Sequence, residues 1–323
     1  MRAVVMRAFG PPQVLEVAEV PDPLPGPGEV TIDVELAGVT FVETQVRAGR
    51  PPSPRMPPRL PAILGNGVGG RVSATGLEVS GDLIGRRVIA SLSGTGGYAG
   101  RAVAAAGRLV EVPSGVALGD AVALLADGRT ALGLARRAGL RAGDTVVVEA
   151  AAGGVGSLLV QLARGAGARV VALASSERKL AVARDLGADL AVSYGSDGWA
   201  DRVRYAAGEA DVVFDGVGGE IGLAAFGLLG PGGRFLPFGM ASGDFAPVSP
   251  PLAEERQVSV LVPVPLAPDE MTGLTRAALA EAAAGRLRPV IGQVLDLAKA
   301  ADAHAAIEAR ETIGKTLLTT TAG

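Results

Sequence analysis

Short apolar or alternating runs, separated by glycine and proline, fill the first third of the chain. Between Met1 and about Pro113 they read RAVVMRAF, VLEVAEVP, EVTIDVELAGV, GGRVSATG, RRVIASL and LVEVP. Short strands with turn residues between them are typical of an irregular, largely antiparallel β domain. The stretch RAGRPPSPRMPPRLP, Arg47 to Pro61, holds too much proline for a helix or a central strand. We predict a surface loop there.

From about Ala117 the pattern changes to helices that alternate with short apolar strands. The predicted strands are DTVVVEA, RVVALA, DLAVSY, ADVVFDGVGG, GGRFLPFG and VSVLVP, and two of the helices are GVGSLLVQLARGAG and SERKLAVARDLGA. Strands that alternate with helices of this length indicate a parallel, doubly wound sheet. The chain then continues, beyond about Pro265, with a helix over 269–284, a β segment near VIGQVLDL, the helix AADAHAAIEAR and the strand KTLLTT. The parallel sheet is therefore predicted to be inserted between two parts of a second domain.

The segment VVVEAAAGGVG, which ends at Gly156, has the form of a dinucleotide-binding loop. Such a loop needs a tight turn after a strand, a residue without a bulky side chain beside the pyrophosphate, and a small residue where the helix packs on the sheet. These positions are Ala151, Gly153 and Gly156, and the alanine suits the turn if its φ is negative. The N–H groups of the following helix would then face the phosphates. The alternative is a glycine turn without a ligand.

The strand after this loop bears on the choice between NAD and NADP. NAD sites usually carry an acidic residue about twenty residues further on, which binds the ribose 2′-OH. Here the segment reads ALASSERK, with Ser175 and Ser176 at that place and two cations, Arg178 and Lys179, close by. Hydroxyl donors and cations favour a 2′-phosphate, and therefore NADPH, provided that Glu177 points away. The alternative is that the two cations are solvated positions at a helix start.

Composition and charge narrow the class of partner. A chain of 323 residues with 48% hydrophobic residues is long enough for two domains. Its net charge of −3 leaves no basic excess for nucleic acid, so we expect a small-molecule ligand. There is no cysteine and one histidine, His304, which excludes disulfides and thiolate zinc sites. Neither a signal peptide nor a membrane span is recognisable, so we predict a cytoplasmic protein.

These segments resemble the zinc-free quinone oxidoreductase (zeta-crystallin-like) branch of the medium-chain dehydrogenase/reductase superfamily. The resemblance covers nearly the whole chain, from GPPQVLEVAEVPDPLPGPGEVTIDVELAGV through GYAGRAVAAAGRLVEVP, GRTALGLA, LGADLAVSY and FDGVGG to IEARETIGKTLL. Its most specific part is AAAGGVG, followed by QLA and SSERK. The resemblance implies a GroES-like β domain over residues 1–122 and 265–323, with a Rossmann NADPH-binding domain over 123–264 inserted in it.

The resemblance also implies cofactor contacts, position by position. The pyrophosphate is expected to bind at Gly153, Gly154, Val155 and Gly156. Residues expected to grip the 2′-phosphate are Ser175, Lys179, Tyr194 and Arg310. Positions expected near the nicotinamide or the riboses are Thr130, Gly216, Val217, Phe238, Gly239 and Val262, the last at the start of the segment VPVP.

The zinc-dependent relatives of this branch are distinguished by ligands that this chain lacks. Their cysteine falls in GVTFVET, where Thr40 stands, and their His-Glu pair falls in LGNGVGG, where Asn66 and Gly67 stand. We therefore predict no metal and an acceptor that is already electron-poor: a quinone, or a C=C conjugated to a carbonyl. The protein then has to place the acceptor and hydrogen-bond the oxygen on which charge develops.

Candidate donors to that oxygen are Thr40 and Tyr98 in the first place, with Gln45, Asn66 and Arg129 as further possibilities. The stretch GVTFVETQVRAGRPP departs from the family pattern GVNF.D...R.GLY, which leaves the quinone itself open. Reduction of an enoyl group in a polyketide-type pathway is the rival activity, and a non-catalytic NADPH-binding redox sensor is the rival from another class.

Two further predictions concern the last part of the chain. His304 lies in an alanine-rich helix, AADAHAAIEAR, and is interpreted as a surface or packed histidine rather than a general acid. The apolar segment VSVLVPVPL is interpreted as the edge through which two copies form a homodimer, by analogy with the family. The alternative for that segment is a buried core strand.

Overall fold

The structure is a computed structural model that describes residues 1–53 and 56–320. The chain divides into two compact units. The first unit comprises Met1–Ala126, Pro268–Gly285 and Pro289–Gly323, and the second comprises Asp127–Ala267 with Arg286–Arg288. The second unit is thus inserted into the first along the chain.

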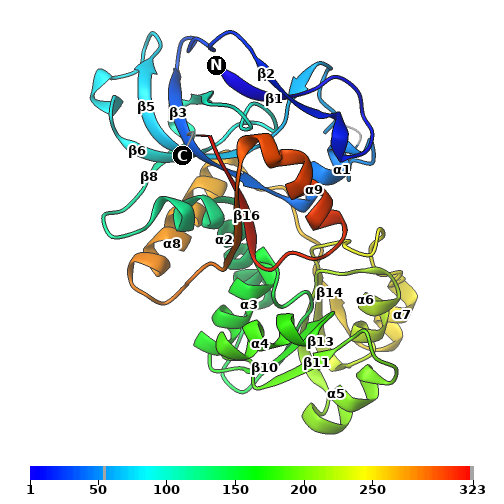
Figure 1. The fold of residues 1–323 in the computed structure, drawn as a ribbon. Coiled ribbons are helices and arrows are strands. Elements are labelled where there is room, and N and C mark those ends of the chain that lie inside the picture. The colour runs from blue at the N-terminus through cyan, green and yellow to red at the C-terminus, as the bar shows by residue number, and fades with distance from the viewer. Residues whose placement is uncertain (54–55, 321–323) are drawn as a thin grey trace. The chain divides into compact units, whose positions relative to one another are not determined.

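The first unit is built on two mostly antiparallel sheets (Figure 1). The larger sheet has the order β15-β16-β3-β5-β6-β8, with β7 also paired to β3, and the smaller has the order β2-β1-β4. β3 is the longest strand and pairs with three others, so it organises the unit. The strands are β1 (Arg2–Met6), β2 (Leu15–Glu19), β3 (Glu29–Val39), β4 (Ala62–Ile63), β5 (Gly67–Thr75), β6 (Arg87–Ser91), β7 (Arg101–Ala105), β8 (Leu109–Glu111), β15 (Ile291–Asp296) and β16 (Lys315–Thr319).

Helices complete the first unit. α9 (Ala300–Glu308) carries Ala303 into the same apolar core as Met6 of β1 and Val68 of β5. The other helices of the unit are α1 (Phe41–Arg47) and α8 (Pro268–Ala283). α2 (Leu118–Ala138) begins in the first unit and ends in the second. No helix in the described part of the chain is long and apolar enough to cross a membrane.

The second unit is a six-stranded, all-parallel sheet in the order β11-β10-β9-β12-β13-β14. Counted along the chain this is 3-2-1-4-5-6, the doubly wound order, whose direction reverses between β9 and β12. α3 and α4 lie on one side of the strands and α6 and α7 on the other (Figure 1). The elements are β9 (Thr145–Val148), α3 (Gly154–Gly165), β10 (Arg169–Ala174), α4 (Glu177–Asp185), β11 (Leu190–Ser193), α5 (Trp199–Ala207), β12 (Ala210–Asp215), α6 (Gly219–Phe226), β13 (Leu229–Pro237), α7 (Pro250–Glu255) and β14 (Ser259–Val260).

The predicted fold class is confirmed: a parallel Rossmann sheet is inserted into a mostly antiparallel β unit. The sequence prediction missed the short elements α1, α5, α6, α7, β4 and β7. Each is shorter than ten residues, so its apolar period is too brief to stand out. The predicted proline-rich loop does follow α1 without regular structure, except that Pro54 and Arg55 lie outside the described residues.

Candidate cofactor and acceptor sites

The loop after β9 has the form that a bound pyrophosphate requires. Its left-handed residue is Ala150, with φ of +46°, so Ala151 keeps the ordinary φ that the sequence interpretation asked for. Two hydrogen bonds hold the turn, one from Ala151 N to Leu173 O at 3.0 Å and one from Gly153 N to Ala150 O at 2.7 Å. α3 then begins without a side-chain cap on its N-terminus. Its first N–H groups, which have no partner within the helix, remain available to an anion.

The glycines of this loop differ in how strictly they are required. A Cβ on Gly156 would lie 2.2 Å from the carbonyl oxygen of Ala150, and that atom belongs to the backbone of the turn. A Cβ on Gly153 would lie 3.1 Å from the same oxygen. A Cβ on Gly154 would meet Asp127 Oδ2 at 2.1 Å, which is the end of a side chain. The tightest backbone constraint therefore falls on Gly156.

A second turn lies against this loop and contains Gly216 and Val217. Val217 N donates to both Glu149 Oε2 and Asp215 Oδ1, each at 3.1 Å, and Gly218 N donates to Asp215 Oδ1 at 2.7 Å. Glu149 follows β9 directly and Asp215 ends β12, so these carboxyls lie at the point where the strand order reverses. In sheets of this kind, ligands bind beyond the carboxyl ends of the strands at that point.

Phe238 and Gly239 pack on the same turn. Their N–H groups donate to Asp215 O at 2.8 and 3.1 Å, and a Cβ on Gly239 would lie 2.4 Å from Gly216 O. The structure therefore brings together four of the predicted cofactor-binding residues, two from the end of β12 and two from the end of β13.

The predicted 2′-phosphate residues of the second unit also come together. Ser175 and Tyr194 follow paired residues at the ends of β10 and β11, and Lys179 Nζ donates to Ser175 Oγ at 3.3 Å. Glu177 is bound to Arg184, and this contact lowers the pKa of Glu177. Its charge is thus paired with a cation about two helical turns further along α4, away from the serine.

The remaining predicted cofactor residues are more scattered. Thr130 lies in α2 and Val262 lies just after β14, where it is exposed. Both belong to the second unit. Arg310 follows α9 in the first unit, with φ of +58°.

In the first unit, the carboxylate of Glu43 is a buried hub for three donors. Its Oε2 accepts from Thr40 N at 2.7 Å and from Tyr98 Oη at 3.1 Å, and its Oε1 accepts from Asn66 N at 2.7 Å. Thr40 and Glu43 also form the capping box that starts α1, with Glu43 N donating back to Thr40 Oγ1. Burial raises the pKa of Glu43, against the opposing effect of these donors and of Lys315.

Tyr98 and His304 extend this network into the core. Both side chains are fully buried, and Tyr98 Oη lies 3.0 Å from His304 Nε2. Loss of hydration and the nearby charge of Arg47 lower the pKa of His304 to about 3, so the ring is neutral at physiological pH. The single hydroxyl hydrogen of Tyr98 is directed to Glu43, which leaves none for the oxygen of an acceptor. Tyr98, which the sequence analysis named as a candidate donor, is thus buried with its hydroxyl on Glu43, and His304 is a packed helix histidine.

Asn66 carries an oriented donor. Its Oδ1 accepts from Leu92 N at 3.1 Å and from Gly94 N at 2.8 Å, so the oxygen of the amide is fixed by two N–H groups. Nδ2 must then occupy the other position, and it has no partner among residues 1–53 and 56–320. The Asn66 amide is half-buried and offers two hydrogens.

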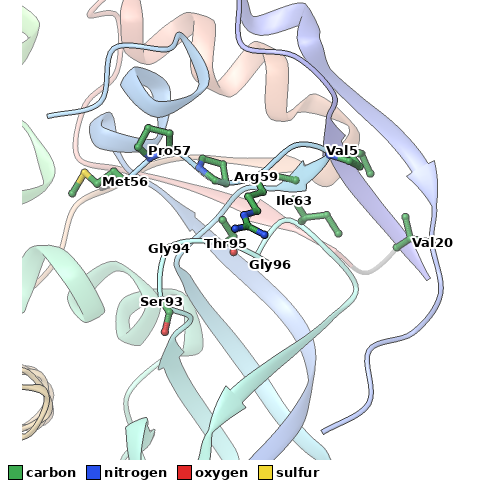
Figure 2. Close-up of a pocket in the computed structure, with 13 residues that line it drawn as sticks. Val5, Val20, Met56, Pro57, Arg59, Ile63, Ser93, Gly94, Thr95 and Gly96 are labelled. Carbon is green, nitrogen blue, oxygen red and sulfur yellow. The ribbon is translucent and has the colours of Figure 1, made fainter. Parts of the chain in front are cut away.

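A pocket of about 550 Å³ opens on the loop that holds this amide. Gly94, whose N–H binds Asn66, lies on its wall together with Ser93, Thr95 and Gly96. Apolar side chains such as Val5 and Ile63 form other walls, and Figure 2 shows Arg59 directed into the space. The pocket thus combines apolar walls with hydroxyls and one cation.

In the described parts of the chain, no group of three or more His, Asp or Glu side chains is placed to hold a metal ion. Thr40, which the resemblance places where zinc-dependent relatives have a cysteine, caps α1 with its hydroxyl oxygen.

Sequence reasoning missed Glu43 and Glu149. The signal for Glu43 was the spacing of Thr40 and Glu43, which is that of a capping box before an apolar run. The signal for Glu149 was a carboxyl directly after three apolar strand residues, in VVVE. Its partner Asp215 lies in FDGVGG, one of the segments that carry the family resemblance.

Comparisons with known proteins identify both units. Residues 26–114 match the alcohol dehydrogenase GroES-like domain, and residues 154–276 match the zinc-binding dehydrogenase family. The chain is 32% identical to a quinone oxidoreductase of Pseudomonas aeruginosa, over 98% of this chain and 99% of that protein. It is 31% identical to a 2-haloacrylate reductase of a Burkholderia species, over 98% of each chain.

A mycobacterial protein solved in complex with NADPH has the same fold. It superposes with a TM-score of 0.90 at 33% identity, over 99% of this chain and 100% of that one. The resemblance predicted from the sequence is confirmed: the chain belongs to the medium-chain dehydrogenase/reductase superfamily, in its zeta-crystallin-like quinone oxidoreductase family.

Proposed function

We propose that the protein is an NADPH-dependent, zinc-independent oxidoreductase that transfers hydride to a quinone or to a C=C conjugated to a carbonyl. The observation that carries this proposal is the dinucleotide loop at the reversal point of the parallel sheet, in a chain whose relatives include a quinone oxidoreductase and a 2-haloacrylate reductase. The second relative is named for the reduction of an activated alkene, which favours enones as well as quinones.

Residues of the second unit fit the cofactor. The backbone of residues 153–156 suits the pyrophosphate because Gly156 leaves room that a Cβ would fill. Ser175, Lys179 and Tyr194 suit the 2′-phosphate, and we propose Arg310 as a fourth contact. Bound NADPH supplies the hydride, and the protein's own residues hold the reactants and stabilise the developing charge.

The proposal is tested by following NADPH oxidation against a panel of quinones and α,β-unsaturated carbonyls, with NADH in parallel. Turnover on quinones alone identifies a quinone reductase, whereas turnover on enones identifies an activated-alkene reductase. NADPH binding without turnover across the panel refutes the proposed activity and supports a redox sensor.

Lys179→Ala tests the cofactor preference. We expect wild-type protein to bind NADPH at least tenfold more tightly than NADH, because hydroxyls and a cation surround the predicted 2′-phosphate site. The variant loses that cation, so its NADPH affinity falls by about tenfold, which corresponds to about 1.4 kcal/mol, while its NADH affinity stays within twofold. Fluorescence titration with both cofactors measures this. If the variant loses affinity equally for NADPH and NADH, Lys179 does not bind the 2′-phosphate.

For the acceptor, we propose Asn66 as the donor to the oxygen on which charge develops, with Thr40 as a second donor. Asn66 Nδ2 is held in one orientation by the bonds to Oδ1, so no reorganisation is needed when charge appears. Thr40 belongs to the same network, because its Oγ1 accepts from Glu43 N and its side chain also hydrogen-bonds the Glu43 carboxylate. Tyr98 acts through Glu43, which binds both Thr40 N and Asn66 N.

Asn66→Asp separates this role from a structural one. The carboxylate keeps two acceptors for Leu92 N and Gly94 N but has no hydrogen to donate. Loss of one such donor typically costs a factor of 10² to 10³ in kcat. We expect kcat to fall by about 10²-fold, with NADPH affinity within twofold of wild type. A variant with wild-type kcat removes Asn66 from the proposed site.

We further propose a homodimer that forms through β14. This strand has only two residues and lies at the edge of the parallel sheet, and Val262 and Val264, which follow it, are more than half exposed. An open edge flanked by exposed apolar side chains is suited to pairing with a second copy. Sedimentation velocity at micromolar concentration tests this, and a monomer there contradicts it.

A further inference from the structure

Two fully buried carboxyls lie beneath the predicted cofactor turn, and the proposed reaction does not use them. Glu149 and Asp215 are both 0% exposed. One oxygen of each carboxyl accepts from Val217 N, at 3.1 Å in both cases. Because they share one N–H group, the two carboxyls are immediate neighbours.

The remaining oxygens of the pair have no ordinary partner. Glu149 Oε1 and Asp215 Oδ2 are buried, and no donor among the described residues reaches either of them. The pair therefore has two N–H donors, from Val217 and Gly218, for two carboxyl groups. Two negative charges in an apolar interior with so few donors would be very costly. A single proton between the carboxyls removes one charge and supplies the missing donor.

We propose that Glu149 is a positioning residue for the cofactor: it carries a proton that it shares with Asp215, and the pair holds the turn of residues 216–218 beside the dinucleotide loop. This inference rests on the proposed NADPH site. It assigns to Glu149 the role of a neutral acid, bound through Oε2 to Val217 N and through its proton to Asp215.

The surroundings of Glu149 agree with this assignment. Burial, and then the charge and hydrogen bond of Asp215, raise the pKa of Glu149 well above its ordinary value. Among the described residues, Asp215 of β12 is the charged group that acts on it. Asp127 of α2 also lies beside the loop, at Gly154, so the loop has a second acidic neighbour. A neutral Glu149 keeps further negative charge away from a bound pyrophosphate.

If Glu149 is protonated in the folded protein, the folding stability falls as pH rises. In the unfolded chain a glutamate ionises near about pH 4.3. The folded protein retains the proton above that pH, so stability falls as pH rises until the folded-state pKa is passed. Glu149→Gln is neutral in both states and lacks this dependence. The Tm of the variant minus that of wild type is therefore expected to increase as pH rises above about 4.3.

Glu220→Gln is the matched control, because Glu220 is an exposed carboxyl on α6 of the same unit. We expect its Tm difference from wild type to stay flat over the same range. Contributions from buried acids that do not contact Glu149 cancel, since they are present in both proteins of each comparison. If the Tm of Glu149→Gln minus that of wild type stays constant or falls as pH rises, the proposal that Glu149 and Asp215 share a proton is wrong.

NADPH affinity tests the positioning role. Glu149→Gln still offers one acceptor and one donor, so its NADPH dissociation constant is expected within threefold of wild type. Glu149→Leu offers neither, and its dissociation constant is expected to rise at least tenfold. Unchanged affinity in the leucine variant overturns the positioning role. If wild-type protein fails to bind NADPH, the proposed function fails instead, and the Tm comparison still decides the state of Glu149.

Discussion

Gly156→Ala is expected to raise the NADPH dissociation constant at least 100-fold. The added Cβ would lie 2.2 Å from Ala150 O, well inside the distance that real Cβ atoms tolerate. That oxygen cannot retreat, because it accepts from Gly153 N at 2.7 Å and the next residue is bound to β10 through Ala151 N. The start of α3 must therefore move away from the turn. The N–H groups at the start of α3 then no longer point to a single pyrophosphate position.

Two other glycines of α3 give a graded control for this prediction. A Cβ on Gly154 meets only the end of the Asp127 side chain, so Gly154→Ala is expected to weaken binding less than Gly156→Ala. A Cβ on Gly165 meets nothing within 4 Å. Gly165→Ala should therefore bind NADPH as wild type does, with a gain of about 0.5–1 kcal/mol from the helical alanine. Fluorescence titration gives the three affinities, and a Gly156→Ala affinity within threefold of wild type contradicts the steric argument.

The parallel sheet and its loop were predictable because their signals are local. Each strand of the second unit is a short apolar run bounded by a helix, and AAAGGVG combines glycines whose requirements are met within a few residues. The sequence could not show whether Ala151 has the negative φ that the turn needs. The backbone shows that the left-handed residue is Ala150, one position earlier. The family pattern does not contain that detail.

The acceptor side was less predictable because it depends on long-range packing. Tyr98 and His304 are 206 positions apart, so nothing in the local sequence joins them. Tyr98 was one of the first two candidate donors to the acceptor, whereas its hydroxyl is buried against Glu43. Asn66 was one of five possible donors, and its fixed amide emerges only when the bonds to Leu92 N and Gly94 N are known.

Glu43→Ala is expected to lower the free energy of unfolding by about 3–5 kcal/mol, because three donors lose their acceptor in a buried site, each at a cost of about 1–3 kcal/mol. These donors are Thr40 N, Asn66 N and the hydroxyl of Tyr98. Urea denaturation measures the loss. Glu16→Ala is the control, since Glu16 is an exposed carboxylate of β2 in the same unit and its removal should cost less than about 0.5 kcal/mol. If Glu43→Ala and Glu16→Ala are equally stable, the three hydrogen bonds to Glu43 do not stabilise the fold.

Glu43→Gln shows why the hub needs a carboxylate. Thr40 N and Tyr98 Oη share Oε2 while Asn66 N uses Oε1, so an amide with one oxygen leaves at least one donor facing its NH₂ group. The expected loss is that of one unsatisfied donor, about 1–3 kcal/mol, and therefore smaller than for alanine.

Burial raises the pKa of Glu43, so the stability of the wild-type protein falls as pH rises above about 4.3. The difference in unfolding free energy between wild type and Glu43→Gln should therefore become smaller at alkaline pH. Because Asn66 N is one of the donors released, kcat should fall with stability in both variants, whereas NADPH affinity should hold.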